Sequence, residues 1–126
     1  MQRSVLALMA SMLISACTPS TTQTVIEDSV TLIIQFEATP EGLPAFAEIM
    51  NGVPEAMKSE EGFVSATVYQ KFDEPEFFVL TEVWKSRELH LEHFDRIVAS
   101  GDWAHIKSLL RREPVMGYYA SGISID

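Results

Sequence analysis

The sequence predicts an α+β fold of the ferredoxin-like type, with the element order β-α-β-β-α-β and helices on one face of an antiparallel sheet. Two segments, 63–72 and 76–84, are rich in aromatic and β-branched residues and are separated only by a short acidic turn. Helical periodicity appears on both sides of this hairpin, and strand-like segments begin and end the domain. The order therefore predicts one domain over residues 29–126.

The first predicted strand covers residues 29–37. Successive side chains of a strand point to opposite faces. One face carries Val30, Leu32, Ile34 and Phe36, and the other carries Thr31, Ile33, Gln35 and Glu37. Both faces are apolar near the centre of the strand, so we expect both to be covered there.

Residues 43–59 follow the 3.6-residue period of an amphipathic helix. The apolar stripe consists of Leu43, Phe46, Ala47, Met50, Val53 and Met57. Pro54 lies inside this stripe, and a proline removes a backbone donor and clashes with the preceding turn. We therefore expect two helical pieces that divide near Gly52.

The central hairpin turns at Asp73-Glu74-Pro75. Pro75 lacks an N–H donor and disfavours the helical region at Glu74, so the chain reverses there. The second strand of the hairpin carries Glu82 and Trp84 close to its end.

A helix is expected directly after the hairpin, with Ser86 as its N-cap. Leu89, His93 and Phe94 share the helical spacing of one face. His93 is therefore expected on or beside the face turned towards the sheet, near Glu82 of the preceding strand.

The C-terminal part contains a helix break and a last strand. The helix is expected to end at Ser100-Gly101, and Asp102 is placed to cap a further helical segment over residues 103–112. Residues 114–125 alternate as a strand does and complete the predicted sheet.

The first 28 residues are expected to lie outside the fold. Residues 1–16 have one positive charge and an apolar run that is too short to span a bilayer, which needs about 20 residues. The end of this run, Leu13-Ile14-Ser15-Ala16-Cys17, resembles the lipobox of bacterial lipoprotein signal peptides. Residues 17–28 are rich in Ser and Thr and predict a flexible tether.

The lipobox resemblance implies an exported chain that is cut before Cys17, whose sulfur and new amino terminus are lipidated. Cys17 is the only cysteine in the sequence, so it has no partner for an internal disulfide. Thr18, rather than Asp, follows it, which by the same resemblance implies the periplasmic side of an outer membrane. An ordinary secretory signal cleaved near Ala16 is the alternative.

Composition excludes some classes of partner. Hydrophobic residues make up 47% and aromatic residues 10% of the chain, which is typical of a packed core. The net charge is −9, which argues against binding to nucleic acid and against electrostatic docking on anionic lipid. Membrane attachment is therefore expected through the lipid anchor alone.

The hairpin and the helix after it match a known pattern in order and spacing. The matching residues are Glu61-Gly62-Phe63, Tyr69, Glu82, Trp84, Ser86, Leu89 and His93. They resemble the antibiotic biosynthesis monooxygenase family, which includes small quinol monooxygenases. The order of elements extends this resemblance over most of residues 30–126.

The resemblance implies a dimeric α/β barrel whose subunits each keep a pocket between sheet and helices. It also implies oxygenation without a metal or flavin cofactor, in which an electron-rich aromatic or quinol substrate loses a proton and passes an electron to oxygen. His93 is then the candidate base, and Glu82 is placed to orient its imidazole. Tyr69 or Trp84 is the candidate hydrogen-bond donor to the developing oxyanion.

Structural roles for the same residues remain open. Glu82 and His93 also suit a polar pair that pins the strand to the helix, and Trp84 suits the core. His90 is interpreted as a surface residue, because no third ligand completes a metal site with His93. His105 is interpreted as solvated, although it lies near the predicted pocket.

Two other functions remain open. A membrane-anchored module that binds a small apolar ligand without catalysis would use the same pocket. A haem-degrading branch shares the fold and resembles a site with an Asn on the first strand and a Trp on the helix, but here the strand has no Asn and His93 stands where that Trp would fall.

The residues themselves also predict a homodimer. An antiparallel sheet with helices on one face leaves its other face open. Both faces of the strands over 29–37 and 76–84 carry large apolar groups, and an exposed apolar patch of this kind usually marks an interface.

Overall fold

The computed structural model describes residues 29–120. Its elements are β1 (Val30–Glu37), α1 (Leu43–Ala56), β2 (Phe63–Gln70), β3 (Phe77–Trp84), α2 (Arg87–Ser100), α3 (Asp102–Ser108) and β4 (Val115–Tyr119). This order confirms the predicted ferredoxin-like α+β class. The predicted signal peptide, the tether with Cys17 and the end of the predicted last strand lie outside the described residues.

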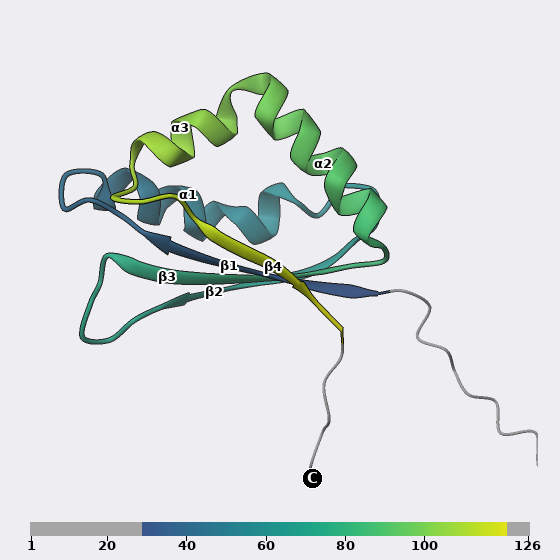
Figure 1. Ribbon diagram of the computed structural model, residues 1–126, viewed down its shortest axis with the longest axis horizontal. Helices are drawn as coiled ribbons and strands as arrows, with labels where there is room; N and C mark the ends of the chain where they lie inside the picture. Colours follow the sequence, from purple (N-terminus) through teal and green to yellow (C-terminus); the bar gives the residue numbers. More distant parts are fainter. Residues whose placement is uncertain (1–28, 121–126) are drawn as a thin grey trace, which may run out of the picture.

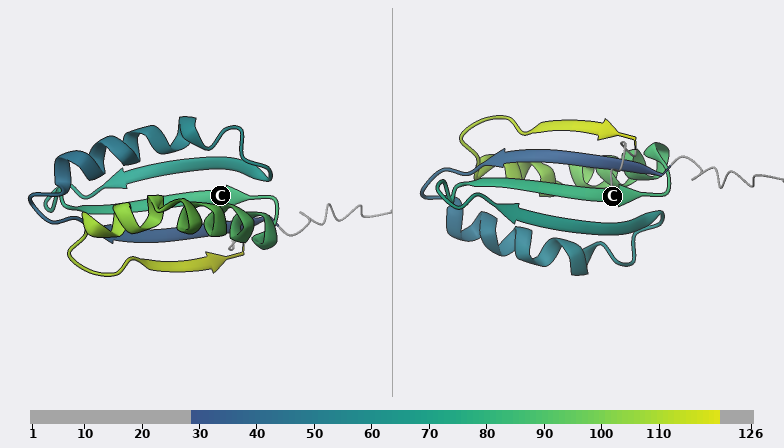
Figure 2. Two further views of the ribbon diagram at one scale, coloured as in Figure 1. Left: turned by 90° about the horizontal axis from the view of Figure 1, so that it is seen from above. Right: turned by 90° about the horizontal axis from the view of Figure 1, so that it is seen from below.

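The four strands form one antiparallel sheet in the order β2-β3-β1-β4. All three helices lie on the same face of this sheet (Figure 1). Seen from the opposite side, no described helix covers the strands (Figure 2). The molecule therefore has one helix-covered face and one open face.

The core fills the space between the sheet and the helices. The register aligns Leu32 with Glu82, Ile34 with Leu80 and Phe36 with Phe78, so these side chains point to the same face. Its fully buried apolar residues are Leu32, Ile34, Phe36, Ala38, Phe46, Met50, Phe78 and Leu80. The apolar side chains that alternate along the strands thus pack in one layer against the apolar side chains of α1.

The expected division of the first helix is wrong. α1 is one continuous helix over Leu43–Ala56, and Pro54 lies inside it. Pro54 falls in the last turn, so its missing N–H removes only one hydrogen bond close to the helix end, and the buried residues Phe46 and Met50 hold the helix to the core.

The second helical break differs in detail from the expectation. Gly101, in the left-handed region at φ 90°, is both the C-cap of α2 and the N-cap of α3, so Asp102 is the first helical residue and not the cap. α3 also ends at Ser108, short of the expected residue 112. The physical reason is that Arg111 N–H donates to the Glu37 carbonyl at 2.8 Å, which draws the chain onto the end of β1.

Gly62 lies where α2 comes close to the start of the hairpin. Its φ is 82°, and a Cβ added there would lie 2.5 Å from Leu89 Cδ1 in the first turn of α2. Ser86 caps that turn as predicted, because its hydroxyl accepts a hydrogen bond from Leu89 N–H at 3.2 Å. The cap and the glycine together fix where α2 starts above the sheet.

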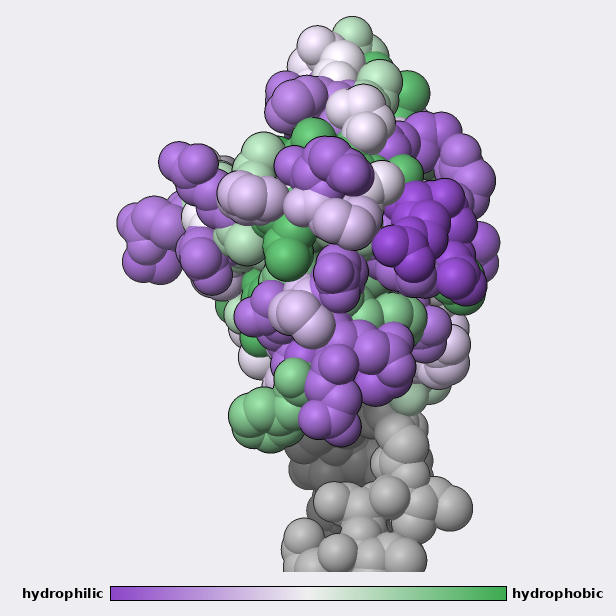
Figure 3. Space-filling view, turned by 90° about the vertical axis from the view of Figure 1, so that its left-hand side faces the viewer, coloured by the Kyte–Doolittle hydropathy of each residue, from purple (hydrophilic) through white to green (hydrophobic). Residues whose placement is uncertain are grey.

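The end of the molecule that carries the β2–β3 turn is mostly hydrophilic (Figure 3). Ion pairs lie on this surface, with Lys71 Nζ 2.7 Å from Glu74 Oε1 and Arg112 Nη2 2.6 Å from Glu37 Oε2. Such exposed pairs contribute little to stability but keep the surface solvated. None of the helices in the described residues is long and apolar enough to cross a membrane.

The open face of the sheet is apolar at its centre. Ile33 of β1 is half-buried there, beside Thr81 of β3 and Gly117 of β4. Tyr119 is 53% exposed and Val115 is 60% exposed on the edge strand. The expected cover over this face is thus not supplied by the described residues of one chain.

We predict that two chains pair through this open face. Light scattering should give twice the chain mass, and Ile33→Glu should yield monomers or unfolded protein because it places a charge in the buried contact. Ala45→Glu adds the same charge to the exposed side of α1 and should leave the mass unchanged. A wild-type chain that remains monomeric at tens of micromolar would contradict the pairing.

Candidate active site

The alternation of β3 brings one carboxyl group into the core. Phe78, Leu80, Glu82 and Trp84 are all buried and face the helices, while the residues between them face the open side. Glu82 is only 4% exposed in a layer that is otherwise apolar. A carboxyl group in this position needs a hydrogen-bond partner.

Trp84 supplies that partner. Its Nε1–H donates to Glu82 Oε2 at 2.7 Å, two residues along the same strand. Burial raises the pKa of the Glu82 carboxyl, and the Trp84 hydrogen bond acts in the opposite direction. Trp84 is fully buried. Because its N–H donates to Glu82, it is not free to donate to a substrate.

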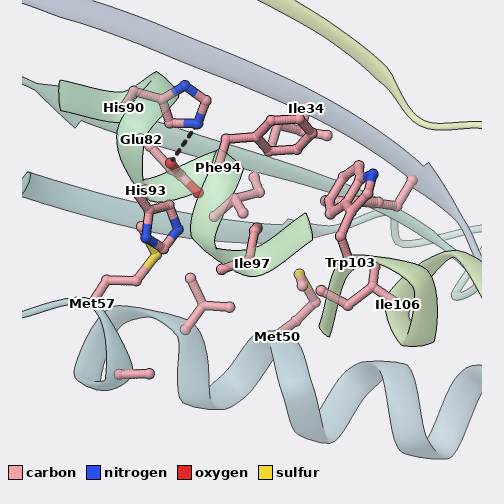
Figure 4. A pocket seen from close by; sticks show the side chains of 14 residues that line it. Ile34, Met50, Met57, Glu82, His90, His93, Phe94, Ile97, Trp103 and Ile106 are labelled. Carbon is pink, nitrogen blue, oxygen red and sulfur yellow. Dashed lines mark ion pairs between the residues drawn. The ribbon is translucent and has the colours of Figure 1, made fainter. Parts of the chain in front are cut away.

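His90 is buried, so its interpretation as a surface residue is wrong. It is 3% exposed because the cap at Ser86 sets a helix register in which both His90 and His93 face inwards. Its Nδ1 lies 2.5 Å from the Tyr118 hydroxyl of β4, and its Nε2 lies 3.9 Å from Glu82 Oε2 (Figure 4). Burial lowers the pKa of His90 to about 4, and His93 adds to this effect.

His93 occupies the inner face of α2, as predicted, and is 9% exposed. Its Nδ1 lies 3.4 Å from Glu60 Oε2, and Glu60 also accepts a hydrogen bond from Arg96 Nη2 at 2.6 Å. Burial lowers the pKa of His93, and the Glu60 carboxylate opposes this effect. At neutral pH the imidazole is thus in the form that accepts a proton.

Glu82 is not the carboxylate that orients His93. Glu82 accepts from Trp84 and has His90 as its nearest histidine partner, whereas the partner of His93 is Glu60. The expected polar pair between Glu82 and His93 is for the same reason not formed. The sequence could not show this, because both histidines lie on the same side of one helix.

Tyr69 lies apart from the other candidate residues. It is 56% exposed and pairs with Val79, whose side chain points to the open face of the sheet. Within one chain, Tyr69 therefore does not face His93. His105 of α3 is exposed, as expected.

A cavity of about 150 Å³ lies between the sheet and the helices. Its polar groups, Glu82, His90 and His93, gather at one end, and Trp103, Ile106 and Met50 line the other end (Figure 4). Among the residues that the structure describes, no cluster of three or more His, Cys, Asp and Glu side chains is suited to hold a metal ion. The arrangement combines an apolar body that can hold a ring with neutral bases at one end.

Comparison with known families gives a match that covers more than half of the sequence. Residues 29–105 match the family described as antibiotic biosynthesis monooxygenase. The chain belongs to the antibiotic biosynthesis monooxygenase family. This confirms the resemblance drawn from the hairpin and the helix after it. A comparison with curated protein sequences gave no match.

Solved structures of similar fold include proteins described as oxygenases. A conserved protein from Methanosarcina mazei has a TM-score of 0.67 at 20% identity, covering 77% of this chain and 96% of that one. SnoaB, a cofactor-independent oxygenase from Streptomyces nogalater, has a TM-score of 0.66 at 15% identity, with 78% and 97% covered. A monooxygenase from Streptomyces coelicolor in complex with nanaomycin D has a TM-score of 0.63 at 20% identity, with 79% and 92% covered. At these identities the likeness establishes the fold.

Three residues of the candidate site are not predicted by the sequence patterns. His90 is interpreted there as a surface residue, and no pattern assigns a role to Glu60 or Tyr118. For His90 a signal was present, because it lies three residues before His93 and shares its face. Glu60 and Tyr118 reach the site from distant parts of the chain, and no local spacing marks them.

The buried state of His90 predicts a specific loss of stability in acid. The folded pKa of about 4 lies below the ordinary value of 6.5, so the unfolded chain binds the proton first as the pH falls. The stability contributed by neutral His90 is complete above pH 6.5 and is lost as the pH falls towards 4, with a total of about 3 kcal/mol.

His90→Gln should therefore lose about 3 kcal/mol less free energy of unfolding than wild type between pH 7 and pH 4. Urea unfolding at the two pH values measures the difference. His105→Gln replaces an exposed histidine and should follow wild type. Parallel losses in the His90 variant and in wild type would contradict the buried neutral state.

Proposed function

We propose that this protein is a cofactor-independent monooxygenase that oxygenates a small electron-rich aromatic or quinol substrate. Membership of the antibiotic biosynthesis monooxygenase family and the oxygenases of similar fold support the reaction class. The observation that carries the proposal is the apolar cavity with His93 at its polar end and Glu60 behind that histidine.

The size of the cavity favours a substrate of one ring. An apolar cavity of about 150 Å³ is large enough to bind benzene. Fused-ring compounds and haem, a four-pyrrole macrocycle, would require the helices to move. The cavity therefore suits a hydroquinone better than it suits a polycyclic quinol, and it speaks against the haem alternative.

The base is assigned to His93 because its geometry leaves one ring nitrogen free for the substrate. Nδ1 lies 3.4 Å from the Glu60 carboxylate and makes no hydrogen bond with the residues that the structure describes, and the carboxylate stabilises the imidazolium formed when Nε2 accepts a proton. Glu82 is engaged by Trp84, and His90 Nδ1 is engaged by Tyr118. The separation of 3.4 Å between His93 and Glu60 is long for a hydrogen bond, and such contacts often shorten when substrate binds.

The overall reaction balances without any further reductant. One hydroquinone and one molecule of oxygen give one hydroxyquinone and one water, and the substrate supplies all four electrons. His93 takes the phenolic proton, and the resulting anion passes an electron to oxygen. The apolar body of the cavity excludes water from the reactive anion while the new carbon–oxygen bond forms.

Removal of the base should abolish turnover while leaving the fold intact. We expect His93→Gln to lower the rate of oxygen uptake with hydroquinone by about 10²–10⁴, the usual contribution of a general base. An oxygen electrode measures the rate, and a melting curve checks the fold. His105→Gln is the matched control, since it replaces an exposed histidine of α3 and should keep full activity.

The same experiment separates an oxygenase from a binding module. A folded His93→Gln variant that consumes oxygen at the wild-type rate would overturn the assignment of the base. Wild-type protein that binds hydroquinone without consuming oxygen would instead indicate the non-catalytic alternative.

We also propose that the protein is anchored to the bacterial cell envelope by a lipid on Cys17, on the periplasmic side of an outer membrane. The lipobox-like ending and the single cysteine support this. Cys17→Ala should release the chain from the membrane fraction or leave it unprocessed, as an immunoblot of cell fractions would show. Thr18→Ser, a matched change beside the lipidation site, should keep the membrane association. Unchanged membrane association of the Cys17 variant would refute the anchor.

A further inference from the structure

His90 and Tyr118 form a contact that has no role in the reaction steps proposed above. The two residues come from α2 and β4, and the distance from Nδ1 to the phenolic oxygen is 2.5 Å. His90 is 3% exposed, whereas Tyr118 is only half-buried. The pair therefore reaches from the interior towards the surface.

His90 lines the buried cavity, whereas Tyr118 lines a separate hollow at the surface. On the inside, His90 lines the cavity, and its Nε2 lies 3.9 Å from Glu82 Oε2. On the outside, Tyr118 lines an open hollow of about 530 Å³, whose lining includes the polar residues Ser29, Arg87 and Glu88. One imidazole and one hydroxyl group thus separate the reaction cavity from a hollow that is open to the surface.

We propose that His90 and Tyr118 form a proton-transfer path between the buried cavity and solvent. This inference rests on the proposed oxygenase function, because that reaction must return a proton to the oxygen that leaves as water. His93 takes the first proton from the substrate, and the second path serves the oxygen chemistry at the same end of the cavity.

The transfer balances without electrons or a co-reactant. The Nε2–H bond of His90 breaks as its proton passes to an anionic oxygen in the cavity. The Tyr118 O–H bond breaks and a new Nδ1–H bond forms, and solvent then returns a proton to the phenolic oxygen. The reverse sequence carries a proton outwards.

The surroundings of His90 and Tyr118 favour proton transfer through the pair without a lasting charge on either residue. Because burial lowers the pKa of His90 to about 4, its imidazole stays neutral and changes only its tautomer. Burial raises the pKa of Tyr118, while Arg87 acts in the opposite direction. The Arg87 guanidinium lies 4.8 Å from the ring centroid of Tyr118, where its charge stabilises a transient phenolate.

Tyr118→Phe tests the path because it removes only the hydroxyl group. The first measurement needs no ligand: nuclear magnetic resonance follows the exchange of the His90 ring proton with solvent in the full chain. We expect exchange to be about 10²-fold slower in the variant, the lower end of what a positioned proton-transfer group contributes. Tyr119→Phe removes the neighbouring hydroxyl, which lies on the other face of β4, and should exchange as wild type does.

The second measurement uses hydroquinone and an oxygen electrode. We expect kcat of Tyr118→Phe to fall by about 10²-fold with KM unchanged. Added imidazole should restore part of the rate, and the solvent deuterium isotope effect should increase. A purely structural role of Tyr118 would move neither of these two readouts.

The outcomes distinguish this inference from the proposed function. Ring-proton exchange in Tyr118→Phe at the wild-type rate would overturn the path, whatever the activity. Slower exchange in a chain that consumes no oxygen would support the path and refute the oxygenase. A loss of kcat that no small buffer restores, with exchange unchanged, would place Tyr118 in packing only.

Discussion

The hydrogen bond from Trp84 to Glu82 allows the sheet to carry a carboxyl group into a layer that is otherwise apolar. Without it, the buried carboxyl would have no donor on its own strand and would cost about 1–3 kcal/mol as an unsatisfied group. The same indole contacts both histidines of α2, with ring centroids 5.3 Å from His90 and 5.2 Å from His93. One tryptophan therefore contacts all three polar groups of the cavity.

The two histidines face the same cavity but have different partners. Their ring centroids are 6.3 Å apart, and a charge on His93 disfavours a charge on His90. Glu60 stands behind His93, so a proton taken up there is stabilised. Tyr118 stands behind His90, so this ring has a neutral partner that both donates and accepts. A single helical turn thus presents two imidazoles that burial keeps neutral, but only His93 has a carboxylate beside it that favours its charged form.

Most of the fold was predictable because its signals are local. Aromatic and β-branched runs, the proline turn and the cap at Ser86 each act over a few residues, and the period-two pattern correctly placed Phe78, Leu80, Glu82 and Trp84 on one face. The partners of His90 and His93 were not predictable. Their choice depends on where Glu60 and Tyr118 arrive from other parts of the chain, and on the rotation of α2, which spacing alone leaves undetermined.

The close approach at Gly62 limits how the cavity can change in evolution. Any side chain at position 62 would meet Leu89 and push the start of α2, with both histidines, away from Trp84. Raising the helix is therefore a costly way to admit a larger ring. Trimming side chains at the far end is less costly, because Met50, Trp103 and Ile106 lie opposite the polar groups and hold none of them. Lineages with this glycine are expected to change the size of the cavity at those positions while its polar end stays fixed.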